Sequence, residues 1–231
     1  NEELQKDIEN IKSQGGIVPL LAIIRVGEQG DDIAYERSVM KRCDMVGVKV
    51  QNYRFSSDVS QEELLTTINR LNKDKTIHGL LVFRPLPKHI DDTAIRKAIL
   101  PDKDVDGITD GSLAAVFVGA KEGFPPCTAQ ACIDILNHYD IDVKGKRVAV
   151  IGRSLVVGKP VAMMLVKLNA TVTICHTKTV DMPKICNEND ILIVAAGSPK
   201  IIDTQYINSE HIIIDVGINV DENSKLCGDV N

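Results

Sequence analysis

A glycine-bounded loop after an aliphatic run in the second half of the chain is the clearest candidate for cofactor chemistry. The run Arg147–Ile151 is typical of a buried strand, and Gly152, Ser154 and Gly158 follow it with the spacing G-x-S-x-x-x-G, ahead of a helical stretch. Gly152 permits a sharp exit from the strand, and the amides at the start of the helix can receive a pyrophosphate. Because the spacing departs from G-x-G-x-x-G, an ordinary strand-to-helix turn is the alternative. The order strand, loop, helix and second strand favours a dinucleotide site.

The next strand indicates which dinucleotide would bind. A site for NAD usually has Asp or Glu at the end of this strand, where the acid holds the ribose hydroxyls. Here the strand ends in C-H-T-K-T, from Cys175 to Thr179, without an acid. Arg153, Thr177 and Lys178 can instead surround a 2′-phosphate, for which a guanidinium is well suited. Each basic residue alone is explained as a solvated surface charge, but together they favour NADP over NAD.

Several groups in the first half could hold a polar ligand, and each also has an ordinary structural explanation. Tyr35 lies at a helix start, where a partly buried tyrosine with a solvated hydroxyl is the simplest interpretation. The loop Phe83–Pro87 leaves the carboxyl end of a predicted strand, where α/β proteins bind ligands, but it is also a rigid turn. Asp102, Asp104 and Asp106 gather in one loop, which lacks the later ligands of a calcium-binding EF-hand. A single Asp holding a polar ligand is therefore favoured.

Alternating helical and strand patterns must position these groups. In the first half, continuous aliphatic runs predict buried strands and periodic polar stretches predict helices, in the order β-α-β-α-β, which implies a parallel sheet. The predicted strands are Pro19–Val26, Val48–Phe55 and Gly79–Phe83, and the predicted helices are Glu2–Gln14, Ile33–Val46, Glu62–Leu71 and Asp91–Leu100. A capping box of Ser60 and Glu63 supports the third of these helices.

The pattern restarts after a Gly/Pro-rich loop that ends at Pro126. Further strands are predicted at Arg147–Ile151, Ala170–Cys175, Ile191–Ala196 and Ile212–Val216, and helices at Ala129–Tyr139, Val161–Leu168 and Met182–Glu188, with Thr128 as a possible cap. The fold class is therefore α/β, with two parallel-sheet domains. They are an N-terminal substrate domain over residues 1–126 and a C-terminal Rossmann-like dinucleotide-binding domain over residues 127–231. A cleft between two such domains is where a ligand is expected.

Composition narrows the class of protein. The chain has 231 residues, 44% of them hydrophobic, and a net charge of −5, which argues against binding to nucleic acid or to an anionic membrane surface. Its apolar runs are too short to span a membrane. The six cysteines form no C-x2-C pair, so no metal site is expected, and reduced thiols in a cytoplasmic protein are the simplest interpretation. Aromatic residues are only 3% of the chain, with no Trp, so the core must be aliphatic.

Together, the motifs resemble those of the methylenetetrahydrofolate dehydrogenase/methenyltetrahydrofolate cyclohydrolase family, over nearly the whole chain. In the second half they are V-I-G-R-S-L-V-V-G-K-P, N-A-T-V-T-I-C-H-T-K-T, D-I-L-I-V-A-A-G-S-P, I-I-D-V-G-I-N and G-D-V. In the first half they are the Tyr35 helix, P-L-P, K-D-V-D-G and P-C-T. The resemblance implies NADP-dependent oxidation of 5,10-methylenetetrahydrofolate in one-carbon metabolism, hydrolysis of the methenyl product to 10-formyltetrahydrofolate, and a homodimer formed through the cofactor domain.

The resemblance also implies roles for individual residues. Tyr35 would stack on the folate ring system beside the Pro85 loop, and Asp106 would hydrogen-bond the pterin, which makes Tyr35 and Asp106 the catalytic candidates. The remaining candidates would bind the cofactor: Arg153 and Ser154 at the phosphates, Thr177 near the 2′-phosphate and Ile218 near the nicotinamide, together with Gly152, Gly158 and His176.

Two departures from the family pattern affect the second activity. The family helix has a Lys four residues after the Tyr, on which hydrolysis depends, and this chain has Val39 there. The Gln that partners that Lys is replaced by Phe83, and Arg84 replaces a Leu. Lys41 lies two residues further along, which turns it about 200° away on a helix. Because Val and Phe cannot move protons, we expect a dehydrogenase whose cyclohydrolase activity is lost or weak.

Three alternatives remain open. One is a full bifunctional enzyme that uses Arg84 or Lys41 differently, and another is a non-catalytic homologue that binds NADP or folate. The third is a related two-domain dehydrogenase for a small acid, of the shikimate type. Relative to the family, this sequence also lacks the usual N-terminal start and the Pro/Gly-rich loop and helix after G-D-V. That loop closes over the substrate in the family, so we expect a protein that truly lacked it to be impaired, and the mass of the intact protein shows whether it is present.

Overall fold

The structure is a computed structural model that describes residues 2–120, 123–223 and 225–231. It forms two compact units, Asn1–Asp110 and Gly111–Asn231, each of which is described by itself. The sequence places the domain boundary later, at Pro126. The difference is helix α5 (Asp110–Val118) with the loop after it, which the internal contacts group with the second unit. The boundary at Pro126 therefore stays a prediction.

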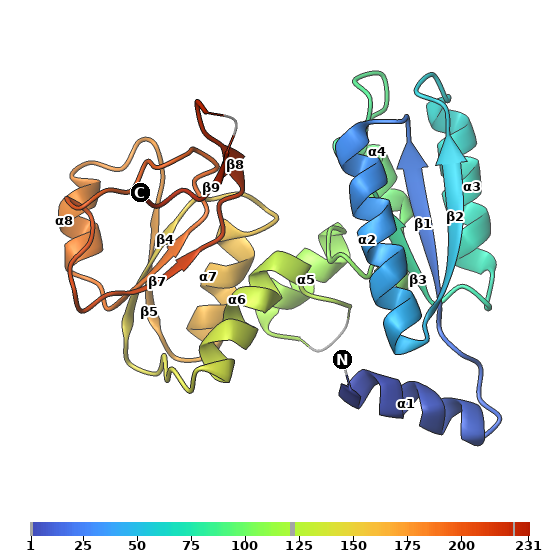
Figure 1. Cartoon of the computed structure of the whole chain (residues 1–231), viewed down its shortest axis with the longest axis horizontal. Coiled ribbons are helices and arrows are strands. Elements are labelled where there is room, and N and C mark those ends of the chain that lie inside the picture. Colours follow the sequence, from blue (N-terminus) through green and yellow to red (C-terminus); the bar gives the residue numbers. More distant parts are fainter. Residues whose placement is uncertain (1, 121–122, 224) are drawn as a thin grey trace. The chain divides into compact units, whose positions relative to one another are not determined.

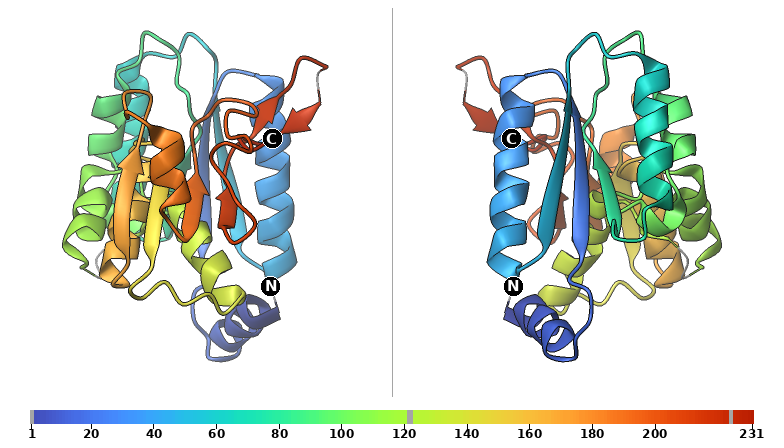
Figure 2. Two further views of the ribbon diagram at one scale, coloured as in Figure 1. Left: turned by 90° about the vertical axis from the view of Figure 1, so that its left-hand side faces the viewer. Right: turned by 90° about the vertical axis from the view of Figure 1, so that its right-hand side faces the viewer.

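The first unit is built on a three-stranded parallel sheet. Its strands are β1 (Leu20–Val26), β2 (Lys49–Phe55) and β3 (Gly79–Val82), in the order β2-β1-β3. The right-hand view of Figure 2 shows α2 on one face of the sheet and α3 on the other. The helices of this unit are α1 (Glu2–Ser13), α2 (Gly30–Val46), α3 (Gln61–Lys73) and α4 (Asp92–Ala98), with the short 3-10 helix η1 (Pro101–Lys103).

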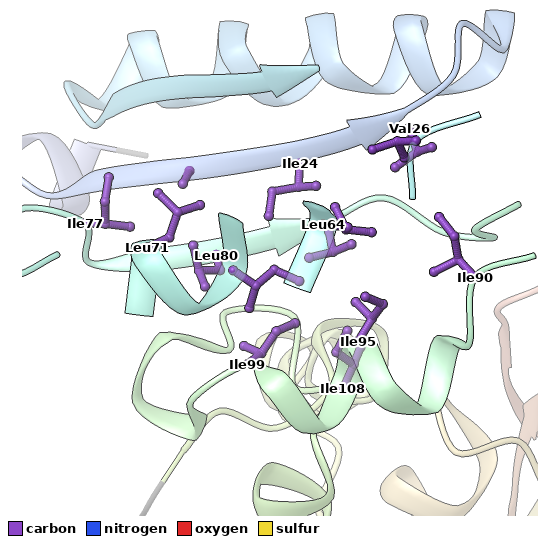
Figure 3. Packing of buried hydrophobic residues seen from close by; sticks show 14 residues of the cluster. Ile24, Val26, Leu64, Leu71, Ile77, Leu80, Ile90, Ile95, Ile99 and Ile108 are labelled. Atoms are coloured by element: carbon purple, nitrogen blue, oxygen red, sulfur yellow. The ribbon is translucent and has the colours of Figure 1, made fainter. Parts of the chain in front are cut away.

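Two aliphatic clusters hold the sheet between its helices. Successive strand residues face opposite sides, so Ile24 and Leu80 pack toward α3 and α4, whereas Ile23 and Leu81 face α2. The larger cluster is made of Ile, Leu, Val and Ala side chains, and Figure 3 shows how they interdigitate. The smaller cluster is centred on Ile23, Leu81 and Phe83. The low aromatic content thus corresponds to an aliphatic core, as the sequence predicts.

Local signals explain where several helices begin and end. Ser60 Oγ accepts the N–H of Glu63 at 3.2 Å, which confirms the predicted N-cap of α3. Gly47 ends α2 in the left-handed conformation, at φ 84°, where a residue without Cβ is favoured. The prediction that Thr128 caps a helix is wrong. Helix α6 (Cys127–His138) begins at the residue before Thr128 and has Pro126 at its N-cap, so Thr128 already lies inside the helix.

The second unit contains a parallel sheet of β4 (Arg147–Ile151), β5 (Thr171–Cys175), β6 (Ile191–Val194) and β7 (Ile212–Asp215), in the order β5-β4-β6-β7. Figure 1 shows α7 (Gly158–Lys167) and α8 (Met182–Asn187) on opposite sides of it. Helices α6 and α7 pack on one face and α8 on the other, which is the doubly wound arrangement. The short strands β8 (Asn219–Val220) and β9 (Leu226–Cys227) complete this unit. The predicted α/β class with two parallel sheets is confirmed.

The buried thiols belong to this aliphatic interior. Cys132, Cys175 and Cys186 are buried, and burial raises the pKa of Cys132 and of Cys186 to about 11. These thiols stay protonated at neutral pH and act as small apolar side chains. Within the part of the chain that the structure describes, no helix is long and apolar enough to cross a bilayer.

Candidate functional site

Two aromatic side chains meet at the carboxyl edge of the first sheet. Phe83 directly follows β3, is 5% exposed, and donates its backbone N–H to Ile24 O at 2.9 Å. Tyr35, near the start of α2, is 54% exposed. The two ring centroids are 5.0 Å apart and the planes are tilted by 43°. Phe83 therefore supports the Tyr35 ring from inside, while much of that ring stays open to a flat ligand.

The positions that carry Lys and Gln in the family pattern lie in one apolar cluster. Val39, one turn after Tyr35 on α2, packs against the cluster of Ile23, Leu81 and Phe83. An aliphatic side chain and a buried phenyl ring can exclude water there, but they can neither donate nor accept a proton.

Of the two cations that could substitute for the family Lys, Lys41 lies at the other end of the sheet and Arg84 is engaged in an ion pair. Lys41 is exposed and lines a hollow with Gly47 and Lys49, at the amino end of β2, whereas the aromatic pair lies at the carboxyl end of the sheet. Arg84 donates from Nε and Nη2 to the two carboxylate oxygens of Asp92, at 2.7 and 2.6 Å. Asp92 therefore ties Arg84 to α4 through a bidentate pair, which fixes the plane of the guanidinium.

The Asp106 loop is held beside β3 by another carboxylate. Asp104 is 1% exposed, and its two oxygens accept the N–H groups of Ile108 at 3.0 Å and of Thr109 at 2.7 Å. Val105 packs against the cluster that contains Phe83. Asp106, the next residue, is half-buried. Pro85 follows Arg84 through a cis peptide bond and is exposed. The structure thus gathers Tyr35, Val39 and Phe83, and it places the loops of Pro85 and Asp106 after and beside the same strand, β3.

A buried ion-pair network next to Tyr35 was not expected from the sequence. Glu36 Oε2 accepts from Arg25 Nε at 2.7 Å, and Glu36 Oε1 accepts from Arg54 Nε at 3.0 Å. Arg25 and Glu36 are 6% and 5% exposed. Burial alone would raise the pKa of Glu36, but the hydrogen bonds from Arg54 and Arg25 hold that pKa below its ordinary value. The network joins α2 to β1 and β2 and so fixes the helical turn that carries Tyr35.

In the second unit, two glycines form a cradle after β4. Gly152 has φ +132°, and a Cβ there would lie 2.2 Å from Ala195 O. A Cβ on Gly158 would lie 2.1 Å from Gly152 O, so the two ends of the loop touch backbone to backbone. Ser154 Oγ accepts the N–H of Val157 at 3.1 Å and keeps the loop compact. This is the close packing that the glycines of a dinucleotide-binding loop provide, so the residues fit that kind of cofactor.

The turn after β5 lies beside this loop. Gly152 donates its N–H to Cys175 O at 2.9 Å, which joins the ends of the two strands. His176 receives the N–H of Lys178 on Nδ1 at 3.1 Å and donates its own backbone N–H to Thr179 Oγ1 at 2.9 Å. His176 therefore shapes the turn, and Thr177 is exposed at its tip.

The structure brings the expected cofactor residues to the carboxyl edge of the second sheet. Arg153 is exposed next to Gly152. Ile218, on the loop between β7 and β8, is 82% exposed, which is unusual for a large aliphatic side chain. The expected folate residues belong to the first unit and the expected cofactor residues to the second, so each group is assembled within its own unit.

Comparison with known proteins connects both groups to one family. Residues 1–106 match the catalytic domain of tetrahydrofolate dehydrogenase/cyclohydrolase, and residues 126–231 match its NAD(P)-binding domain. A Clostridium kluyveri relative named bifunctional protein FolD is 48% identical over 100% of this chain and 81% of that protein. The crystal structure of the bifunctional FolD enzyme from Campylobacter jejuni is 39% identical, with a TM-score of 0.96, over 100% of this chain and 81% of that one.

A third relative carries a cofactor. The Trypanosoma brucei dehydrogenase-cyclohydrolase, complexed with NADP and an inhibitor, is 32% identical, with a TM-score of 0.92, over 99% of this chain and 80% of that one. The two domain matches together span most of the chain, in the order that the sequence motifs predict. The chain therefore belongs to the tetrahydrofolate dehydrogenase/cyclohydrolase family.

Proposed function

We propose that this chain oxidises 5,10-methylenetetrahydrofolate to 5,10-methenyltetrahydrofolate with NADP as the hydride acceptor. The observation that carries the proposal is the Tyr35 ring, which is more than half exposed and rests on buried Phe83 within the family's catalytic domain. A flat pterin can stack on such a surface at little entropic cost, because the supporting ring already fixes the tyrosine. Asp106, at the neighbouring loop, would hydrogen-bond the polar edge of the pterin.

The residues of the second unit would hold the cofactor. The Gly152–Gly158 cradle and the amides at the start of α7 would receive the pyrophosphate, with Arg153 and Ser154 beside it. When bound, the nicotinamide supplies the carbon that accepts the hydride. The protein's contribution is then to hold the folate at a fixed distance and orientation from the nicotinamide.

The preference for NADP over NAD rests on the turn after β5. Thr177 and Lys178 follow the strand where an NAD site would carry an acid, and the bond from Gly152 to Cys175 keeps this turn next to Arg153. A 2′-phosphate would meet a guanidinium, a hydroxyl and an ammonium group there. Comparison of the KM values for NADP and NAD tests this preference.

The comparisons favour hydrolysis of the methenyl product by the same chain. The curated relatives, at 46–48% identity, are named bifunctional. Our sequence-based expectation that the cyclohydrolase is lost or weak therefore gains no support from them, and the bifunctional alternative fits them better.

One structural observation keeps a second candidate, a dehydrogenase with a weak cyclohydrolase. Val39 and Phe83 fill the positions of the family Lys and Gln with apolar side chains, and Arg84 is engaged by Asp92. A bifunctional chain must therefore move the proton of the attacking water with other groups.

Decay of added 5,10-methenyltetrahydrofolate separates the two candidates. The bifunctional proposal expects the purified protein to accelerate this decay well above the buffer rate. If the decay stays at the buffer rate while the same protein still forms NADPH from methylenetetrahydrofolate, the chain has only the dehydrogenase activity.

Family membership also leads us to propose that the chain acts as a homodimer, in the cytoplasm. The support for both is the family resemblance. Sedimentation equilibrium of the full chain tests the dimer, and a monomer across the concentration range would contradict it.

A further inference from the structure

Three loops at the carboxyl edge of the second sheet meet at one buried carboxylate. Asp229 is 0% exposed. Its Oδ2 accepts the N–H groups of Ala196 at 2.7 Å and Gly197 at 2.9 Å, and its Oδ1 accepts the N–H of Ser198 at 3.0 Å. Asn219 Nδ2 donates to the same Oδ1 at 2.8 Å. Asp229 thus joins the loop after β6, which supplies three consecutive amides, to the loop after β7.

A second carboxylate fixes Asp229 itself. Asp215, the last residue of β7, accepts the N–H groups of Gly217 at 2.9 Å and Asp229 at 3.1 Å on Oδ1, and that of Val230 at 3.0 Å on Oδ2. A Cβ on Gly217 would lie 2.4 Å from the carboxyl carbon of Asp229, and a Cβ on Gly228 would lie 1.9 Å from Asp215 Oδ2. The two carboxylates are therefore packed directly against backbone, so neither can shift without moving a loop.

This arrangement touches the expected cofactor residues at two points. Gly152 of the phosphate cradle packs against the carbonyl of Ala195, the neighbour of the first amide bound by Asp229. Exposed Ile218 lies between Gly217, which packs on the Asp229 carboxyl group, and Asn219, which donates to it. The positions of both the cradle wall and Ile218 are therefore set from the same side chain.

We infer that Asp229 is a positioning residue for the nicotinamide half of the cofactor. This rests on the proposed function, which places NADP at this edge with its nicotinamide near Ile218. Asp229 is too buried to touch the ligand and acts by holding the loops after β6 and β7 in register with each other. The adenosine half would be received by the loops after β4 and β5. The hydrogen bonds of these loops involve Ser154, Cys175, His176 and Thr179, and not Asp229.

The substitution Asp229→Asn tests the inference with little change of volume. One oxygen becomes an amide nitrogen, which cannot accept, so two of the four donors lose their acceptor. At saturating NADP we expect kcat for methylenetetrahydrofolate oxidation to fall about tenfold or more, since a displacement near 1 Å at a reacting centre costs about that or worse. The Kd of the nicotinamide-free fragment 2′-phospho-ADP-ribose should rise less, by no more than about threefold, because the cradle meets Asp229 only through the residue next to Ala196, whereas Ile218 lies between two residues that contact Asp229 directly.

Two further variants keep the test decisive. Asn219→Ala removes only one of the four bonds, so kcat should fall in the same direction by a smaller factor, and this variant decides alone if Asp229→Asn does not fold. Asp142→Asn is the matched control: its carboxylate accepts the N–H of Lys144 in an exposed turn of the same unit, and kcat should not change.

The outcomes separate this inference from the proposed function. If Asp229 has a merely structural role, its substitution would lower the melting temperature, or it would raise the Kd of the fragment and the Kd of NADP by the same factor. Either result, with kcat unchanged, would overturn the inference. If the wild-type chain binds NADP but oxidises no folate, the proposed reaction fails. The inference is then tested by the ratio of the Kd for NADP to that for the fragment, which should rise only in the Asp229 and Asn219 variants.

Discussion

The ring of Tyr35 lies 5.0 Å from the ring of Phe83, centroid to centroid, and is tilted by 43° against it. The protein has only four Tyr and four Phe and no Trp, and two of these few rings lie together at one edge of a sheet. One ring is buried and the other exposed. This pair forms the proposed folate surface, and it also places a phenyl ring where the family pattern carries the hydrogen-bonding amide of a Gln.

Removal of the Tyr35 ring tests the stacking surface. Tyr35→Ala should raise the KM for methylenetetrahydrofolate about tenfold, since an aromatic contact of this kind contributes about 1 kcal/mol beyond the area it buries. Tyr35→Phe keeps the ring and should stay within about threefold of wild type. Tyr139→Ala, which removes an exposed tyrosine of the second unit, is the control. Equal KM values for Tyr35→Ala and wild type would sink the stacking role.

Restoration of the family pair tests whether the apolar cluster limits hydrolysis. The double substitution Val39→Lys with Phe83→Gln should raise the rate of methenyltetrahydrofolate decay by at least about tenfold, because positioned acid–base groups contribute that much or more. Val50→Lys adds a lysine against the same cluster from β2 and should bring no gain. If the wild type already accelerates methenyltetrahydrofolate decay and the double variant is no faster, the apolar cluster does not limit hydrolysis. The chain would then be bifunctional with a different set of proton-transfer groups.

Loss of the Arg153 guanidinium tests the preference for NADP. Arg153→Ala should weaken NADP binding about tenfold or more, since a charge-assisted hydrogen bond contributes about 1.5–3 kcal/mol, and NAD binding, which lacks the 2′-phosphate contact, should fall by a clearly smaller factor. Lys144→Ala removes an exposed cation before β4 and serves as the control. Kd values from fluorescence titration provide the comparison, and an equal loss for both cofactors would argue against a 2′-phosphate contact.

The buried pair of Arg25 and Glu36 gives the fold a dependence on pH. The pKa of Glu36 is lowered in the folded protein, so its contribution to stability is present above the ordinary value of 4.5 and is lost as the pH falls through the lower folded value. Glu36→Gln should cost about 3 kcal/mol near pH 7, because Arg25 is left buried without its partner charge.

The difference in unfolding free energy between wild type and Glu36→Gln should shrink as the pH drops below 4.5. Urea titrations at several pH values measure it. Glu9→Gln, an exposed change on α1, should show no such trend. A constant difference between pH 7 and acid would contradict the assignment of this pH dependence to Glu36.

Much of the fold is predictable because several of its strands are nearly continuous aliphatic runs. Leu20–Val26 and Ile191–Val194 are buried on both faces, and that pattern belongs to parallel sheets. Helix α5 was not predicted, since its segment carries Phe117 and Val118 in exposed positions and has no clear amphipathic period. The start of α7 was also placed too late, because Gly158 and Pro160 are poor helix formers outside a first turn.

The site was predictable only where a motif is local in sequence. The Gly152 loop and the Tyr35 helix each occupy a short stretch with a recognisable pattern. Glu36 and Arg54 meet across two elements, and Asp229 bonds amides some thirty residues away, so no spacing rule joins them. For Asp229 the available signal was the G-D-V motif itself, a carboxylate next to a glycine near buried strands. A charge inside the aliphatic run of β1 was the corresponding signal for Arg25.

The most direct test of the account is a coupled assay of the full chain with 5,10-methylenetetrahydrofolate and either NADP or NAD. Reduced nicotinamide, 5,10-methenyltetrahydrofolate and 10-formyltetrahydrofolate are followed together. If the proposed reaction is right, NADPH forms in an amount equal to the two folate products combined, at a higher rate than NADH forms with NAD. Protein that binds NADP but forms no reduced nicotinamide from this folate would contradict it.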